Sequence, residues 1–215
     1  MKWLFGLLAG LLITGAVGAE ELAPDVLVRN VTNEVLDIVR KDKDIQAGNT
    51  RKAIELVEAK VLPHFNFARM AALAMGKEWR QASPAQRQSL TDEFRILLVR
   101  TYSKALTEYR NQTIDFKPVK VQPADTDVRM RTEIRQPGGK PVQLDYFLEK
   151  SSGWKVYDIE VAGISLVTNY RDSFAQEIRA GGIDGLIGTL QAKNKAADTP
   201  AAKKQCSRQV VIAFR

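Results

Sequence analysis

Hydrophobic positions recur every three or four residues from Pro24 to about Tyr109, a spacing that predicts amphipathic helices. We expect four helices. The first carries Val28, Val31, Val35 and Ile38, and the second carries Ile54, Val57 and Val61 and ends before Pro63. A short third helix over 67–75 ends at Gly76, and a long fourth helix runs to about Tyr109.

The long helix has the clearest start signal. Ser83 can cap it, Pro84 suits the first helical position, and Gln86 can complete a capping box. Its apolar stripe is wide, which predicts that the helix lies across a sheet or a cavity. The stripe comprises Leu90, Phe94, Leu97, Leu98, Thr101, Tyr102, Ala105, Leu106 and Tyr109.

From Gln112 the hydrophobic period changes to two, which predicts strands over 113–121, 127–136, 141–150 and 153–161 in an antiparallel meander. One face of the sheet should be apolar and the other in water. Arg129, Arg131 and Arg135 alternate on the wet face, where they could steer the protein toward acidic partners. Alternation also places Asp145 in water, and Asp158 on one face with Trp154 and Val156.

Helical spacing returns over 163–179, and Gly181 and Gly182 are expected to close that helix before a last one over 183–190. The tail over 193–215 is predicted to be disordered, because 193–205 is rich in Ala, Lys, Thr and Pro without periodicity. The predicted fold class is therefore α+β, with a helical part over about 24–110, a sheet of about four strands over about 112–161 and closing helices over 163–190.

The first residues predict export. Lys2 is followed by an uncharged run over 3–17 and by small residues up to Ala19, the pattern of a signal peptide over 1–19 that is cleaved after Ala19. The run is shorter than the roughly 20 residues that a membrane-spanning helix needs. We therefore expect a mature domain over 20–192 outside the cytoplasm, where nucleic acid is not an expected partner.

Composition narrows the chemistry further. The chain of 215 residues holds 32 basic and 25 acidic residues, a net charge of +7 that suits an anionic partner such as a lipid headgroup or a membrane surface. With one cysteine, Cys206, and one histidine, His64, neither an intramolecular disulfide nor a metal site is expected. No cofactor is predicted.

Candidate catalytic residues are few. The Gly-x-Ser-x-Gly nucleophile elbow of serine hydrolases and the Gly-x-x-x-x-Gly-Lys phosphate-binding loop of nucleoside triphosphatases are both missing from the sequence. Asp158 could enter a cavity and act as a base after burial raises its pKa, but a hydrogen bond to a tyrosine or a backbone amide is the commoner outcome. We predict that the protein is not an enzyme and has no catalytic residues.

The remaining candidates for a functional site are the apolar side chains. The helical stripes and the apolar sheet face can form a filled core or enclose a pocket, and periodicity alone does not separate these alternatives. The candidate lining residues are Phe94, Leu97, Leu98, Tyr102, Met130, Leu144, Tyr146, Val156, Val167 and Tyr170.

Two blocks, Leu62 to Leu106 and Gly153 to Leu190, resemble the MlaC family, also called the toluene-tolerance family, of periplasmic phospholipid-binding proteins of Gram-negative bacteria. The most specific pieces are Phe67-Ala68-Arg69-Met70, Trp79-Arg80, Ser83-Pro84, Trp154-Lys155-Val156-Tyr157-Asp158, Gly163-Ile164-Ser165-Leu166-Val167 and Gly182-Ile183-Asp184-Gly185-Leu186. The resemblance runs from about Pro24 to Leu190, and the segment from about Cys206 onward lies outside it.

The resemblance implies a curved sheet of the nuclear-transport-factor-like type, a helical subdomain beside it, and a cavity for acyl chains. It also implies a monomeric carrier that moves phospholipid between an outer-membrane lipoprotein assembly and an inner-membrane ABC transporter with its anchored lipid-binding subunit, and so maintains outer-membrane lipid asymmetry. The alternatives are a small enzyme of the same sheet type with a polar pocket around Asp158, and a ligand-free periplasmic adaptor with a filled interior.

Overall fold

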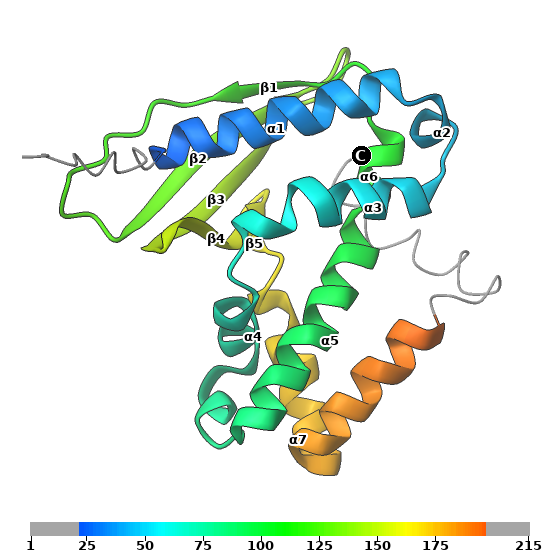
Figure 1. Cartoon of the computed structure of the whole chain (residues 1–215), viewed down its shortest axis with the longest axis vertical. Helices are drawn as coiled ribbons and strands as arrows, with labels where there is room; N and C mark the ends of the chain where they lie inside the picture. The colour runs from blue at the N-terminus through cyan, green and yellow to red at the C-terminus, as the bar shows by residue number, and fades with distance from the viewer. Residues whose placement is uncertain (1–21, 197–215) are drawn as a thin grey trace, which may run out of the picture.

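The computed structural model describes residues 22–196, which form a sheet lobe and a helical lobe (Figure 1). The sheet lobe combines a five-stranded antiparallel sheet with α1 (Pro24–Lys41), α2 (Lys43–Gln46), α3 (Thr50–Lys60) and α6 (Lys104–Glu108). The helical lobe consists of α4 (Phe67–Met75), α5 (Pro84–Tyr102) and α7 (Arg171–Ala196), with the short 3-10 helix η2 (Gly76–Arg80) between α4 and α5.

The first helix forms as its periodicity predicts and lies along the sheet (Figure 1). It ends at Lys41, and the carboxylate of Asp42 then accepts hydrogen bonds from the backbone N–H groups of Asp44 and Ile45, at 2.9 and 3.1 Å. These bonds cap α2. In α3 the buried positions are Ala53 and Leu56 instead of the predicted stripe, because α3 packs between α1 and α6 and the small alanine allows a close approach.

The capping box of α5 is confirmed. The Ser83 hydroxyl accepts a hydrogen bond from the Gln86 backbone N–H, and the Gln86 side chain accepts one from the Ser83 backbone N–H, at 3.2 and 3.0 Å. The predicted length of this helix was wrong, because it ends at Tyr102 and α6 begins separately after Ser103.

The sequence predicted that α5 lies across a sheet or a cavity, and the sheet alternative is wrong. Its apolar stripe packs against α4 and α7, and the ring of Phe94 meets those of Tyr170 and Phe174 edge-on, with centroids 5.2 Å apart in both pairs. The wide stripe therefore reflects burial between two helices, which periodicity does not distinguish from burial against a sheet.

The sheet follows the order β1 (Thr113–Phe116), β2 (Asp127–Arg135), β3 (Val142–Ser151), β4 (Gly153–Val161) and β5 (Ile164–Ser165). Four of these strands match predicted ones, the first being shorter than expected. The fifth lies where a helix over 163–179 was predicted. There, Ser165 accepts hydrogen bonds from the backbone N–H groups of Val167 and Thr168, which hold a turn, so the helix begins only at Arg171 after the 3-10 helix η3 (Thr168–Tyr170).

The predicted break at the glycine pair is confirmed, because α7 consists of two helical segments that meet at a kink at Gly182. Gly182 has φ 68° and ψ −172°, a non-helical conformation that favours glycine, and the second segment reaches Ala196, beyond the predicted end at Leu190. Asn194 donates to the backbone and side-chain oxygens of Glu93 on α5, at 2.9 and 2.7 Å, which explains why 193–196 is helical and not part of a disordered tail. The predicted signal peptide, most of the predicted tail and Cys206 lie outside the described residues.

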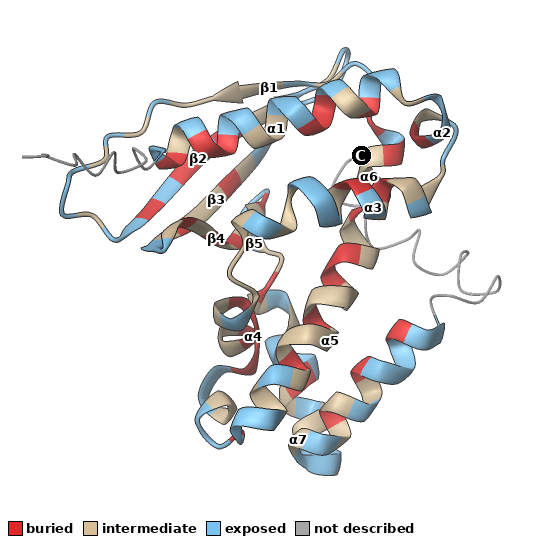
Figure 2. Ribbon diagram, in the orientation of Figure 1, coloured by how far each residue is buried: buried red, intermediate tan, exposed pale blue. Residues whose placement is uncertain are grey.

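Buried residues occur in both lobes (Figure 2). Their side chains form three apolar clusters. The helical-lobe cluster lies among α4, α5 and α7; the α1–sheet cluster lies between the start of α1 and the sheet; the third lies among the second half of α1, α2, α3 and α6. Phe65 packs against the first two clusters, and Val31 against the second and third. Apolar contact is therefore continuous from one end of the molecule to the other. Within residues 22–196 no helix is long and apolar enough to cross a membrane.

Candidate functional site

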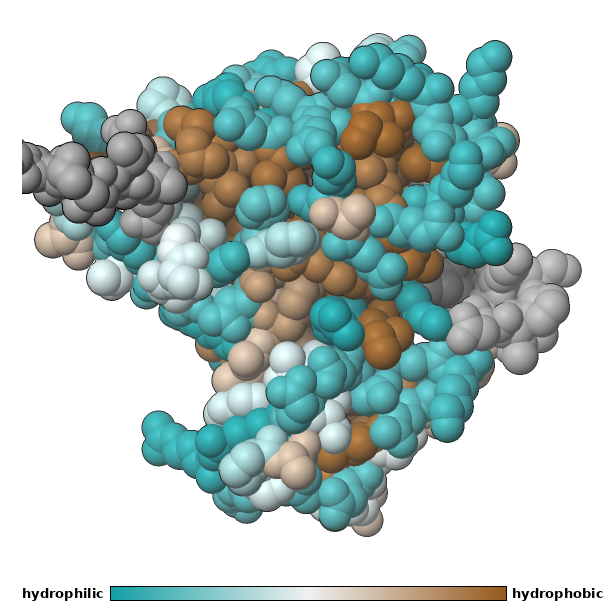
Figure 3. Space-filling view, viewed as in Figure 1, coloured by the Kyte–Doolittle hydropathy of each residue, from teal (hydrophilic) through white to brown (hydrophobic). Residues whose placement is uncertain are grey.

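The candidate site is the apolar layer between α1 and the inner face of the sheet. Met130, Tyr146 and Ile159 stand side by side on β2, β3 and β4, because strand register pairs Met130 with Tyr146 and Tyr146 with Ile159. Leu27 and Val28 of α1 pack against this row. Figure 3 shows hydrophobic surface gathered between α1 and α3, in front of the sheet.

Tyr146 is the polar member of this layer. Its hydroxyl forms a hydrogen bond with the side chain of Thr32 on α1, and burial raises its pKa to about 12, so the phenol is neutral at physiological pH. Part of the Tyr146 side chain nevertheless remains accessible, as do parts of Val31 and Phe65. The layer thus keeps apolar surface that is not fully covered by protein, at the place where α1 meets the sheet.

The predicted lining residues divide between the two lobes. Met130, Tyr146 and Val156 belong to the α1–sheet cluster. Leu144 points to the same sheet face, paired with Thr132 and Val161, and is partly exposed. The others pack in the helical-lobe cluster: Phe94, Leu97, Leu98, Tyr102, Val167 and Tyr170. The structure does not bring the two groups into one cluster.

Sequence reasoning missed the contribution of the first helix to this layer. Leu27, Val28 and Val31 face the sheet, and Phe65 follows the short 3-10 helix η1 (Leu62–His64) and pairs with Val156 through an isolated parallel bridge. Periodicity showed that α1 has an apolar side. Nothing in the sequence showed that this side, and not that of α5, covers the sheet.

Asp158 does not share a face with Trp154 and Val156 as predicted. A β-bulge shifts the register between Phe147 and Leu148, so that Asp158 lies opposite Phe147 while Val156 lies opposite Leu148. Neighbouring residues of β3 point to opposite faces, and Asp158 is therefore turned to the outer face of the sheet. The correction removes Asp158 from the α1–sheet layer.

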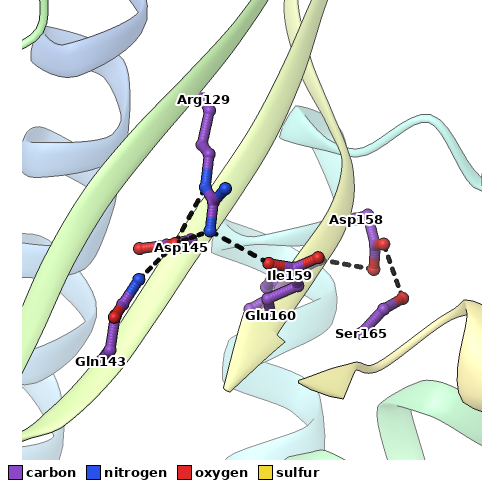
Figure 4. A network of polar contacts seen from close by, with 7 residues as sticks. All are labelled: Arg129, Gln143, Asp145, Asp158, Ile159, Glu160 and Ser165. Atoms are coloured by element: carbon purple, nitrogen blue, oxygen red, sulfur yellow. Dashed lines mark hydrogen bonds and ion pairs between the residues drawn. The ribbon is translucent and has the colours of Figure 1, made fainter. Parts of the chain in front are cut away.

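The carboxylate of Asp158 has structural partners. The Ser165 hydroxyl donates to it at 2.6 Å and the Ile159 backbone N–H at 2.8 Å, which connects β4 to β5 (Figure 4). Burial raises the pKa of Asp158, and these hydrogen bonds oppose the rise. The expected hydrogen bond to a backbone amide is thus confirmed.

Asp145, which alternation placed in water, is fully buried. It does point to the outer face, but Arg129 and Gln143 cover it, donating to the same carboxylate oxygen (Figure 4). Arg129 also contacts Glu160 at 3.2 Å. Arg129 is therefore engaged within the sheet, as is Arg135, which pairs with Asp115 and Glu133. Arg131 alone of the three arginines makes no ion pair with another described residue.

The described part of the chain holds no cluster of three or more His, Cys, Asp or Glu side chains that could bind a metal ion. His64 is partly buried, and burial, together with the charge of Lys155, lowers its pKa. The geometry thus supplies an apolar layer in which the Tyr146 hydroxyl is neutral, and no metal-binding cluster among residues 22–196.

Comparisons with known proteins agree with this geometry. Residues 29–192 match the model of the MlaC protein family. The chain is 27% identical over 197 residues to the intermembrane phospholipid transport system binding protein MlaC of Haemophilus influenzae, covering 88% of this chain and 92% of that protein. It is 28% identical over 190 residues to the toluene tolerance protein ttg2D of Pseudomonas putida, covering 84% and 87%.

A solved structure is also similar. The phospholipid-binding protein of Ralstonia solanacearum, determined in complex with a phospholipid, is 39% identical and superimposes with a TM-score of 0.75, covering 83% of this chain and 100% of that one. Together with the family match over most of the described residues, this likeness leads to one conclusion: the chain belongs to the MlaC protein family.

Proposed function

We propose that the protein is a periplasmic carrier that binds phospholipid and moves it between the outer and inner membranes. The observation that carries the proposal is the phospholipid held by the Ralstonia solanacearum protein, whose whole length matches this chain. The names of both curated relatives, one of an intermembrane phospholipid transport system and one of toluene tolerance, agree with it.

Physical chemistry explains the need for a carrier. Each methylene removed from water contributes about 0.8 kcal/mol, so a lipid with two long chains leaves a membrane for water very rarely. An apolar layer inside a protein offers the chains surroundings like those of the bilayer. The free-energy change for moving a lipid from the membrane to the protein, or back, is then small, as a reversible carrier requires.

We place the acyl chains between α1 and the sheet. Support comes from the apolar surface of Val31, Phe65 and Tyr146, which remains partly accessible where α1 meets the sheet. Separation of α1 from the sheet would expose the apolar faces of both. The predicted residues of the helical lobe, from Phe94 to Tyr170, would contact a lipid only where it extends past Phe65.

The partners belong to the same proposal. They are an outer-membrane lipoprotein assembly and an inner-membrane ABC transporter with its anchored lipid-binding subunit, consistent with a transport system that maintains outer-membrane lipid asymmetry. Export through the signal peptide over 1–19 would bring the protein to the periplasm. We propose no enzymatic activity, because Asp158 faces away from the apolar layer and is held by Ser165 and a backbone amide.

Native mass spectrometry of the mature protein, purified from the periplasm without detergent, tests the proposal. We expect a protein with one or more bound phospholipids, which are released and identified after denaturation. Protein purified in the same way but free of lipid, and unable to take up lipid from vesicles, would contradict the carrier and favour the ligand-free adaptor.

A further inference from the structure

A pocket lies where the end of α1, the end of α2 and the segment between α6 and β1 meet. Its volume is about 420 Å³. The lining residues are all basic or uncharged polar residues: Arg40, Gln46, Tyr109, Arg110, Asn111, Gln112 and Thr113. Two arginines thus open into one pocket whose lining contains no carboxylate.

Tyr109 holds Arg40 in place. The Arg40 guanidinium donates to the Tyr109 hydroxyl at 2.6 Å and lies 5.5 Å from the centroid of its ring. The tyrosine hydroxyl itself donates to the backbone oxygen of Gln112 at 2.8 Å, so its proton is not available to a ligand. The remaining partner of Arg40 is Asp37, an exposed residue one turn earlier on α1, at 3.0 Å.

Arg110 is held by neutral oxygens only. One terminal nitrogen donates to the backbone oxygens of Thr107 and Tyr109, at 2.8 and 2.7 Å, and the other contacts the backbone oxygen of Gln46 at 3.3 Å. A guanidinium carries five N–H groups, and these bonds leave some of them unused. They also leave the positive charge of Arg110 without a partner of opposite charge among the described residues.

Neutral donors complete the pocket. The side-chain oxygen of Gln112 accepts a hydrogen bond from the Arg110 backbone N–H at 2.7 Å, which leaves the amide NH₂ group of Gln112 available. Thr113, the first residue of β1, also lines the pocket. Candidate donors therefore come from α1 and from the segment that leads into β1.

A second polar pocket of about 630 Å³, on the outer face of the sheet, offers a contrast. It contains Lys117 and Arg131 but also Glu133. Lys117 pairs with Asp115 at 2.6 Å and with Glu133 at 3.1 Å. Its charge is thus offset within the protein. In the first pocket the exposed Asp37 is, within residues 22–196, the one carboxylate that contacts either arginine.

We propose that the first pocket binds a phosphate group, either inorganic phosphate or the phosphate of a lipid headgroup. Guanidinium groups bind phosphate oxygens by paired, charge-assisted hydrogen bonds, and a tetrahedral anion can use donors that arrive from several directions. The ring of Tyr109 packs in the apolar cluster of α1, α2, α3 and α6, while its hydroxyl faces the arginine. The site therefore lies beside that cluster, at the end of α1, and the proposal does not depend on the carrier role.

Calorimetric titration of the mature protein with sodium phosphate, at constant ionic strength, tests the site. The test variant is Arg40→Gln. Within the described chain the Arg40 guanidinium contacts only side chains, whereas Arg110 binds the backbone oxygens of Thr107, Tyr109 and Gln46, so replacing Arg110 would also disturb the local fold. Its matched control is Arg131→Gln, which removes the same charge from the second pocket. We expect Arg40→Gln to raise the dissociation constant roughly 10-fold or more, and the control to change it less than about twofold.

A second titration, with a soluble short-chain phosphatidylglycerol, distinguishes the two sources. Weaker binding of both probes by Arg40→Gln supports a general phosphate site, and weaker binding of the lipid alone supports a headgroup site. Equal effects of the two variants on both probes, or no binding of either probe, would overturn the proposal. If Arg40→Gln still co-purifies with the wild-type amount of lipid, the outcome of the phosphate titration does not bear on the proposed carrier function.

Discussion

The two lobes use their apolar residues differently. In the helical lobe α5 packs extensively against α4 and α7, and Phe94 is enclosed by Tyr170 and Phe174. In the sheet lobe Leu27 and Val28 of α1 pack on the strands, but Val31, Phe65 and Tyr146 remain partly accessible where α1 meets the sheet. Close packing resists rearrangement, whereas a loosely covered sheet can admit another apolar molecule at lower cost. The helical lobe is thus suited to be the scaffold, and the sheet lobe to be the site.

The largest expected effect is on lipid binding in the sheet lobe. Leu144→Asp places a carboxylate on the inner sheet face, where burial beside acyl chains is costly, and should abolish phospholipid co-purification. Bound lipid is measured by native mass spectrometry, and the fold by circular dichroism.

The matched control for this change is Ile164→Asp. Ile164 is a hydrophobic residue that is 61% exposed on the edge strand β5, so its replacement should leave lipid content unchanged. Equal lipid loss in both variants, or normal lipid in Leu144→Asp, would contradict the assignment of the site to the inner sheet face.

Substitutions in the helical lobe should change the free energy of unfolding and not lipid binding. Phe94→Ala removes a fully buried ring and should lower the free energy of unfolding by about 3–5 kcal/mol. Urea denaturation measures the change. Lipid bound per folded molecule should stay within about twofold of wild type, because the residue packs in the scaffold. Complete loss of lipid from folded protein would instead show that the cavity extends between α5 and α7.

A smaller effect is expected where α1 is tied to the sheet. Thr32→Val removes the hydrogen-bond partner of the Tyr146 hydroxyl and should cost about 1–2 kcal/mol of stability. Since the bond holds α1 against the strands, lipid exchange with vesicles should become faster. Thr32→Ser keeps a hydroxyl and should exchange at close to the wild-type rate. Slower exchange in Thr32→Val would refute the idea that α1 separates from the sheet.

The smallest effect concerns Asp158 on the outer face. Burial raises its pKa above the ordinary 3.8, so the folded protein binds a proton that the unfolded chain releases. Its contribution to stability is therefore most favourable at low pH and declines as pH rises from about 3.8 through the folded-state pKa. The difference in unfolding free energy between wild type and Asp158→Asn should follow this direction, while lipid content stays constant. A loss of lipid in Asp158→Asn would show that Asp158 belongs to the lipid site.

Local structure was largely predictable from the sequence. The Ser83–Gln86 capping box, the end of α4 at Gly76 and the two hairpins of the meander depend on contacts within a few residues. The candidate site was predictable in part, because alternation identified Met130 and Tyr146 as inward-facing. The same alternation failed after Val156, because a single bulge turns all later positions of the strand to the other face.

The sequence by itself determined that the chain has amphipathic helices, an antiparallel meander with one apolar face, and motifs of a phospholipid-binding family. Only the tertiary structure decided which helix covers that face. Periodicity shows an apolar side on both α1 and α5, and hydrophobic burial has no direction of its own that would say which of them covers the sheet. The position of α7 resolves the choice: by enclosing Phe94 it holds α5 in the helical lobe, and α1 is left to cover Met130 and Tyr146.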